Sequence, residues 1–147
     1  MACRLRAIDV YRIVPDTVLR QTGGGSGTQS ADELYESIRA NQGDVNQIAQ
    51  NTGIKPENIQ AVKDHVFYNE HLLDRYVEQG VPAEWARFDS DLDMGNSWLR
   101  LTDGSFTEED IQMLRHETAE AWYMNRNGPG YSAAHNAAQA RYPSPFQ

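Results

Sequence analysis

Residues 114–124, LRHETAEAWYM, hold a histidine and two glutamates at spacings that suit metal or acid–base chemistry. His116 and Glu120 are four residues apart, so a helix places both on one face, where they can ligate one ion. Glu117 points about 60–100° away from that face and should reach its rim.

The stretch HETAE resembles the start of the metallopeptidase pattern H-E-x-x-H, whose glutamate polarises a metal-bound water. Glu117 would have that role here, but the fifth position holds Glu120 in place of the second histidine. Two other interpretations stay open. One is a metal-free acid–base pair of a histidine and a carboxylate. The other is a solvated helix face on which His116 only pairs with Glu120.

A second segment, the predicted helix 55–80, carries polar residues where burial is expected. Its apolar stripe starts at Ile59 and includes Asn69 and Glu70, with His65 at the edge. Because a glutamate is rarely buried without a partner, this stripe indicates a polar pocket, or else a glutamate bonded to an arginine or a backbone amide.

The predicted last helix, 132–142, is rich in alanine and follows Tyr131, which lies four residues before His135. Small side chains let a helix approach its neighbour closely, so His135 should lie near another helix rather than in water. A histidine on such a face can also be a purely structural hydrogen-bonding group.

Together these residues predict one pocket with hydrolase chemistry. We expect zinc or manganese to bind His116, Glu120 and His135, because imidazole and carboxylate ligands suit both metals. These three residues and Glu117 form the predicted catalytic set. The other residues expected to line the pocket are His65, Asn69, Glu70, Tyr123 and Tyr131.

The composition is that of a globular protein of one domain. The chain has 147 residues, of which 39% are hydrophobic and 23% charged. A net charge of −8 disfavours a protein that grips nucleic acid by its phosphates, although nucleic acid stays open as a substrate of a metal enzyme. A single cysteine, Cys3, excludes an internal disulfide. No apolar run approaches the ~20 residues of a membrane helix, and no signal peptide is recognisable, so we expect no membrane association.

The chain divides into three predicted parts. Residues 1–20 form an extended segment in which AIDVYRIV predicts a short β-strand. Residues 21–30, QTGGGSGTQS, predict a flexible linker, because consecutive glycines hold no fixed backbone cheaply. Residues 31–147 predict a compact, mainly α domain of about six helices.

Helix boundaries follow from capping residues and breakers. Ser30, Asp44 and Thr107 are expected to cap helices, and Gly53 to end one. The expected helices are 30–40, 44–52, 55–80, 82–88, 91–103, 107–125 and 132–142.

Residues 44–67 resemble a helix-turn-helix, with Ala49, Gly53 and Ile59 at the positions of its small residue, its turn glycine and its core aliphatic. This pattern predicts a tight two-helix turn. It disfavours DNA recognition, because two lysines are balanced by two nearby acidic residues and arginine is lacking. A non-enzymatic DNA-binding or protein-interaction domain is the alternative to a hydrolase.

Segments 52–76, 114–124 and 131–143 together resemble the C-terminal modules of bacterial polymorphic toxins, which are also attached to phage head-type proteins. In such proteins a variable toxin domain follows a delivery region and is neutralised by a cognate immunity protein. The resemblance implies an effector of bacterial competition that is cytoplasmic in the producer and is delivered or secreted into a target cell. Its expected partners are an immunity protein and a carrier region. The resemblance assigns no reaction, so nuclease, peptidase, glycan hydrolase and nucleotide-directed activities remain open.

Overall fold

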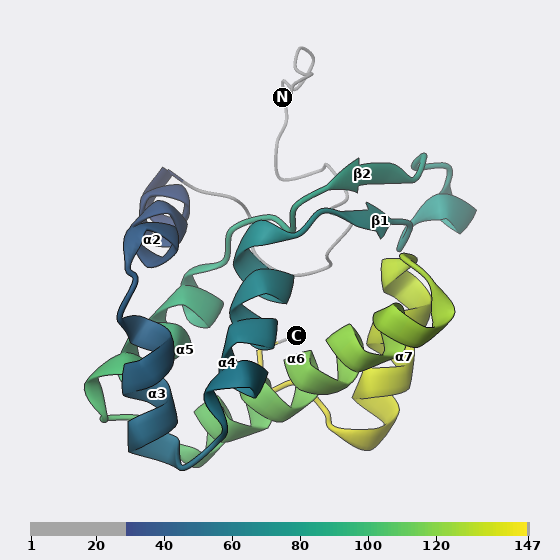
Figure 1. Ribbon diagram of the computed structural model, residues 1–147. Coiled ribbons are helices and arrows are strands. Elements are labelled where there is room, and N and C mark those ends of the chain that lie inside the picture. Colours follow the sequence, from purple (N-terminus) through teal and green to yellow (C-terminus); the bar gives the residue numbers. More distant parts are fainter. Residues whose placement is uncertain (1–28, 147) are drawn as a thin grey trace.

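Six α-helices and one short antiparallel sheet make up the computed structural model, which describes residues 29–146 (Figure 1). The mainly α prediction is confirmed. In chain order the elements are α2 (Gln29–Ala40), α3 (Asp44–Thr52), α4 (Pro56–Lys63), the π-helical turn η3 (Asp64–Tyr68), β1 (His71–Leu73), the 3₁₀ turn η4 (Val77–Gln79), β2 (Glu84–Ala86), α5 (Leu92–Asp103), α6 (Glu108–Asn127) and α7 (Tyr131–Arg141).

The predicted segment 1–20 and most of the predicted linker 21–30 lie outside the described residues. Gln29 and Ser30 were assigned to the linker, but they form the first two residues of α2. Ser30 therefore lies inside the helix that it was expected to cap. None of the helices within residues 29–146 is both long and apolar enough to cross a membrane.

The predicted long helix 55–80 is wrong beyond its first eight residues. α4 ends at Lys63, and the chain continues as the wider turn η3. In this turn Asn69 N–H donates a hydrogen bond to the Asp64 carbonyl, five residues earlier, at 2.7 Å. Asn69 itself is extended, with φ −76° and ψ 144°. In β1 burial alternates with the period of two of a strand, since His71 and Leu73 are buried and Leu72 is half-buried.

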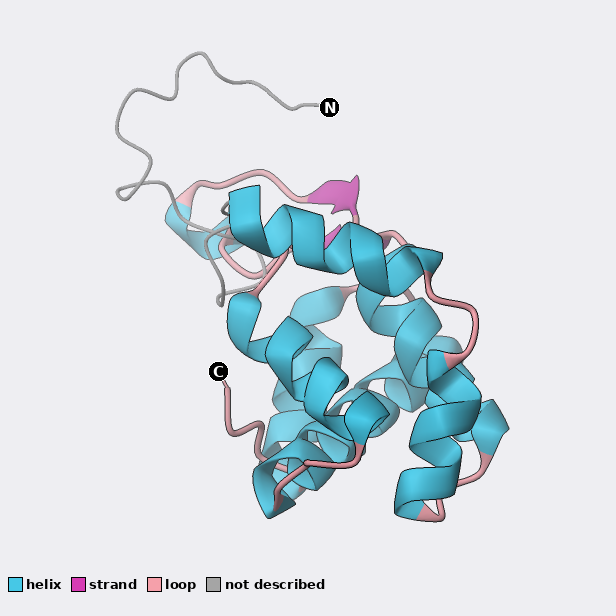
Figure 2. Cartoon of the chain, turned by 90° about the vertical axis from the view of Figure 1, so that its left-hand side faces the viewer, coloured by secondary structure: helices cyan, strands magenta, loops and turns pink. Residues whose placement is uncertain are grey.

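The predicted helix 82–88 is also wrong, since its central residues form β2. The two strands pair antiparallel with His71 opposite Ala86 and Leu73 opposite Glu84. Each strand has only three residues. Figure 2 shows that the strands form one edge of a domain that is otherwise helical.

α6 is the central element of the domain. It packs against α7 on one side and α4 on the other, while α3 packs against both α4 and α5, and α2 against α5 (Figure 1). A reciprocal capping box between Thr107 and Asp110 starts α6, as the sequence predicted for Thr107. Gly53 ends α3 with a left-handed φ of 76°, which allows the tight turn into α4.

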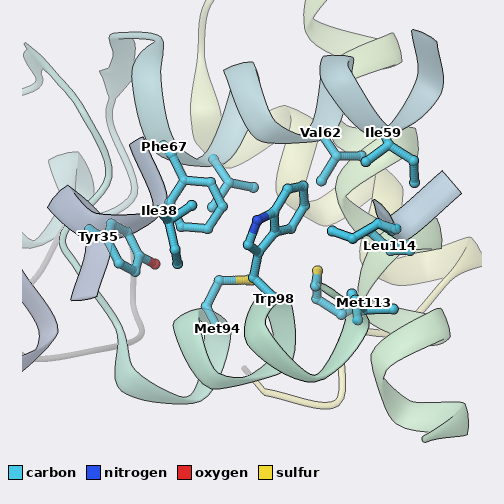
Figure 3. Packing of buried hydrophobic residues seen from close by; sticks show 12 residues of the cluster. Tyr35, Ile38, Ile59, Val62, Phe67, Met94, Trp98, Met113 and Leu114 are labelled. Carbon is cyan, nitrogen blue, oxygen red and sulfur yellow. The ribbon is translucent and has the colours of Figure 1, made fainter. Parts of the chain in front are cut away.

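The hydrophobic core is centred on Trp98 of α5 (Figure 3). Phe67 packs edge-on against Trp98, with ring centroids 5.3 Å apart, and Tyr35 packs edge-on against Phe67 at 4.7 Å. Elements from α2 to α6 supply the rest of this cluster: Ile38, Ile48, Ile59, Val62, Val66, Met94, Leu101, Met113 and Leu114.

A buried ion pair joins α3 to α4 beside this core. Asp44 Oδ1 accepts from Lys63 Nζ at 2.8 Å, and Asp44 Oδ2 accepts from Trp98 Nε1 at 2.9 Å. Lys63 Nζ also donates to the Asn41 carbonyl at 2.7 Å. Asp44 was expected to cap α3, but it is the first residue of that helix and its carboxylate bonds to other elements instead.

Candidate metal centre

All four histidines of the chain are buried, and three of them converge on one carboxylate. His65 Nε2 lies 2.8 Å from Glu120 Oε1. His116 Nε2 and His135 Nδ1 each lie 3.3 Å from the other oxygen, Glu120 Oε2. Because Glu120 is only 1% exposed, the three imidazoles surround a carboxylate that solvent hardly reaches.

Glu117 belongs to the same cluster, one helical turn before Glu120. Its Oε1 lies 3.7 Å from His65 Nε2, and its Oε2 lies 4.0 Å from His116 Nε2. Glu117 was expected at the rim of the site, but it is buried inside it. The cluster contains two sets of candidate ligands that share one glutamate: His116, Glu120 and His135, and His65, Glu117 and Glu120, each with donor atoms within 4.8 Å of one another.

A backbone carbonyl fixes the orientation of the His116 ring. His116 Nδ1 lies 2.8 Å from the Tyr142 carbonyl oxygen, which can only accept, so Nδ1 carries the hydrogen. In the neutral ring Nε2 is then an acceptor, and the oxygens that it faces are acceptors too. His116 Nε2 and Glu117 Oε2 are accordingly buried without a hydrogen-bond partner. A proton shared within the cluster or a bound cation would satisfy them.

The two glutamates differ in their affinity for a proton. Burial, followed by the neighbouring charge of Glu120, raises the pKa of Glu117 well above its ordinary value. Burial also raises the pKa of Glu120, but the three surrounding histidines outweigh it and lower that pKa below the ordinary range of a glutamate. In the metal-free protein the negative charge therefore resides on Glu120, and a divalent cation would let both carboxylates ionise.

His65 reaches this cluster because of the π-helical turn. The wider turn buries His65, Val66 and Phe67 in succession. Val66 and Phe67 enter the hydrophobic core, while His65 points to α6 and Glu120.

The start of α7 is held by residues from β1 and the turn that follows it, which positions His135. Asp74 Oδ1 accepts from the Ser132 N–H at 2.8 Å and so takes the place of a local helix cap. Leu72 N–H donates to the Pro129 carbonyl at 3.0 Å and joins β1 to the turn before α7. His135 lies one turn into the helix that these contacts fix.

Two residues near the cluster were missed by the sequence analysis. His71 Nε2 lies 2.8 Å from the His65 carbonyl oxygen, and its ring stacks on Phe88 with centroids 4.4 Å apart. Burial, followed by the nearby His65, lowers the pKa of His71 to about 4, so this ring is neutral at pH 7. The Phe88 ring also packs against the rings of His65 and Tyr131, with centroids 5.3 Å and 5.0 Å away, so Phe88 covers one side of the cluster.

The structure brings together six of the nine predicted site residues: His65, His116, Glu117, Glu120, Tyr131 and His135. Tyr131 joins through its hydroxyl, 3.4 Å from His135 Nδ1. Asn69 and Glu70 are exposed, because the predicted helix that would have turned them inward ends before them. Tyr123 is half-buried and lines a groove elsewhere on α6.

The two-helix turn between α3 and α4 is present as predicted, but its lysines are not both on the surface. Lys63 is buried in its ion pair with Asp44, so Lys55 is the exposed lysine of segment 44–67. This arrangement offers little positive charge to a DNA backbone.

The chain matches no family model, and no curated protein or solved structure is significantly similar to it, so the arrangement of the cluster itself has to support any functional assignment.

Proposed function

We propose that this domain is a toxin-type effector with a hydrolase activity that depends on a divalent metal ion, zinc or manganese. The observation that carries the proposal is a pair of buried acceptors, His116 Nε2 and Glu117 Oε2, which lie 4.0 Å apart without a hydrogen-bond partner. A buried polar atom left unpaired costs about 1–3 kcal/mol. A cation bound to His116 Nε2 would remove that cost for the imidazole, and Glu117 Oε2 could then bond to a metal-bound water.

The proposed ligands are His116, Glu120 and His135. Three protein ligands leave a fourth position for water, which is the pattern of catalytic zinc sites. The bond from His116 Nδ1–H to the Tyr142 carbonyl supports this set, because a metal-bound histidine usually donates its other ring N–H to such an acceptor. The metal would supply an activated water, and Glu117 lies close enough to the set to accept a proton.

The effector part of the proposal is supported by three segments, 52–76, 114–124 and 131–143, which together resemble polymorphic-toxin modules. Two of these segments contain the proposed ligands: 114–124 contains His116 and Glu120, and 131–143 contains His135. In this proposal a cognate immunity protein and a carrier region are the partners, and the domain acts after delivery into a target cell. Nucleic acid enters only as a substrate, beside peptide and glycan.

Metal binding is tested by titrating the full, chelator-treated chain with zinc and with manganese in a calorimeter, and by melting it with and without each ion. We expect saturable binding and a rise in Tm, because an ion that binds only the folded state stabilises it. Glu120→Gln should abolish both effects. Glu108→Gln is the matched control on the same helix, since the Glu108 side chain is 71% exposed. Equal responses of wild type and Glu120→Gln would exclude this ligand set.

Activity is tested by expressing the full chain in the bacterial cytoplasm and, with an export signal, in the periplasm. The wild type should inhibit growth in at least one compartment, and His116→Ala should not. If the wild type is harmless in both compartments, the effector proposal is wrong, whatever the calorimetry shows.

A structural metal ion is the second candidate, favoured by the burial of the whole cluster. Each of the five side chains is at most 5% exposed, so a substrate reaches them only if a covering residue such as Phe88 moves. Glu117→Gln separates the two candidates. If the metal is catalytic, this variant keeps the zinc-dependent rise in Tm and loses toxicity; if the metal is structural, toxicity is unchanged.

A further inference from the structure

An apolar groove with a volume of about 870 Å³ lies on the side of α6 opposite the candidate metal centre. Ile111 and Trp122 of α6 form one wall, and Ala137 and Ala138 of α7 belong to the other. Trp122 is 58% exposed. A large aromatic side chain that stays exposed beside an apolar groove is typical of an interaction site.

The charged side chains that line the groove are all basic. Arg115 and Arg141 belong to its lining, which contains no aspartate or glutamate. Arg126 stacks on Trp122, with its guanidinium carbon 4.6 Å from the ring centroid. The whole chain has 21 acidic and 13 basic residues, so a lining with arginines and no carboxylate departs from the rest of the protein. Glu108, outside the lining, lies 3.5 Å from Arg115, and both side chains are more than half exposed.

The dimensions of the groove suit a helix. From Ile111 to Trp122 the wall of α6 covers about three helical turns, or ~16 Å. The alanines of α7 allow a third helix to approach closely, as ridges of side chains pack into grooves between helices. An amphipathic helix with apolar anchors at i, i+3 or i+4, and i+7 would fill such a groove.

The chain's own N-terminal segment is a poor candidate for this position. Residues 1–28 contain four arginines and two aspartates, so their net charge has the same sign as the rim of the groove. Charge complementarity instead favours a partner with carboxylates beside its apolar face.

From the basic lining, the apolar walls and the length of the groove, we propose that it binds an amphipathic helix of a partner protein, with the apolar face of that helix against Trp122 and its acidic edge against Arg115 and Arg141. The proposal does not rest on metal binding, because it is argued from the lining of the groove alone.

The experiment uses the full chain and a labelled peptide of about 15 residues, with leucines at helical spacing and glutamates along their edge. Binding is followed by fluorescence anisotropy. The matched control peptide has lysines in place of the glutamates and should bind at least ~10-fold more weakly at low salt. The double variant Arg115→Glu/Arg141→Glu should weaken binding of the acidic peptide about 10-fold, and added salt should weaken the wild-type complex.

Arg87→Glu serves as the control for charge reversal, because Arg87 is exposed and lies outside the groove. Trp122→Ala should also lose affinity, whereas Arg87→Glu should not. Equal binding of the two peptides, or equal binding by wild type and the double variant, overturns the proposal. So does concentration-dependent dimerisation that the double variant abolishes, because the occupant would then be a second copy of the chain.

Discussion

Replacing Asp110 by asparagine should destabilise the domain at neutral pH and destabilise it less at low pH. Asp110 is a buried residue in the first turn of α6. Its carboxylate accepts from Ser97 Oγ at 2.6 Å, from Arg100 Nη2 at 2.7 Å and Nε at 2.9 Å, and from the Thr107 N–H at 2.9 Å. Burial alone would raise the pKa of Asp110, but these donors outweigh burial and lower it from 3.8 to about 2.

The size of the effect follows from this pKa. One pKa unit corresponds to ~1.4 kcal/mol, so a fall from 3.8 to about 2 is worth about 2 kcal/mol. The Arg100 side chain is 37% exposed, and solvent screening there reduces the expected contribution to about 1–2 kcal/mol. Because the pKa is lower in the folded than in the unfolded state, this contribution is fully present above pH ~4 and is lost as the pH falls through about 2.

The assay is urea unfolding of the full chain, followed by circular dichroism, at several pH values from about 7 to about 3. The difference in free energy of unfolding between wild type and Asp110→Asn should shrink over this range. Glu109→Gln is the matched control, because Glu109 is exposed in the same helical turn. A wild-type to Asp110→Asn difference that stays constant from neutral to acidic pH would refute the argument from the pKa.

Two further substitutions test contacts that join elements of the fold: the buried ion pair of Asp44 and the cap that Asp74 provides for α7. Asp44→Ala should lower the free energy of unfolding by about 3–5 kcal/mol, because Lys63 would keep a buried charge without its partner; a loss below ~1 kcal/mol in urea unfolding would show that water reaches Lys63 readily. Asp74→Ala should cost about 1 kcal/mol through the uncapped start of α7. If it also weakens zinc binding in calorimetry, Asp74 positions His135; unchanged affinity in a destabilised variant would assign it to stability alone.

The i, i+4 spacing in HETAE was sufficient to predict that His116 and Glu120 lie together, because helix geometry fixes that relation locally. The sequence could not show that this face turns inward. α6 has a second apolar side that includes Ile111 and Trp122, and both sides satisfy a helical period. Packing of α4 and α7 against α6 decided which side is buried, and Trp122 stayed exposed.

The errors around residues 64–88 have a different cause. Short apolar runs fit a helix or a strand equally well, and the π-helical turn that redirects the chain has no simple sequence signature. Asn69 and Glu70 were therefore assigned to the pocket, while His71 was not. The role of His71 depends on a chain reversal that brings its ring to the carbonyl of His65, six residues earlier.

Tyr142 belongs to two places at once: it lines the groove, and its carbonyl oxygen fixes the His116 ring. If both sites bind as proposed, a partner that shifts Tyr142 changes the affinity of the centre for metal. Thermodynamic linkage then requires the metal to change the partner's affinity by the same factor. The Tyr142 carbonyl would then couple metal binding to partner binding. A metal-loaded domain and a metal-free domain would present different surfaces to the same partner.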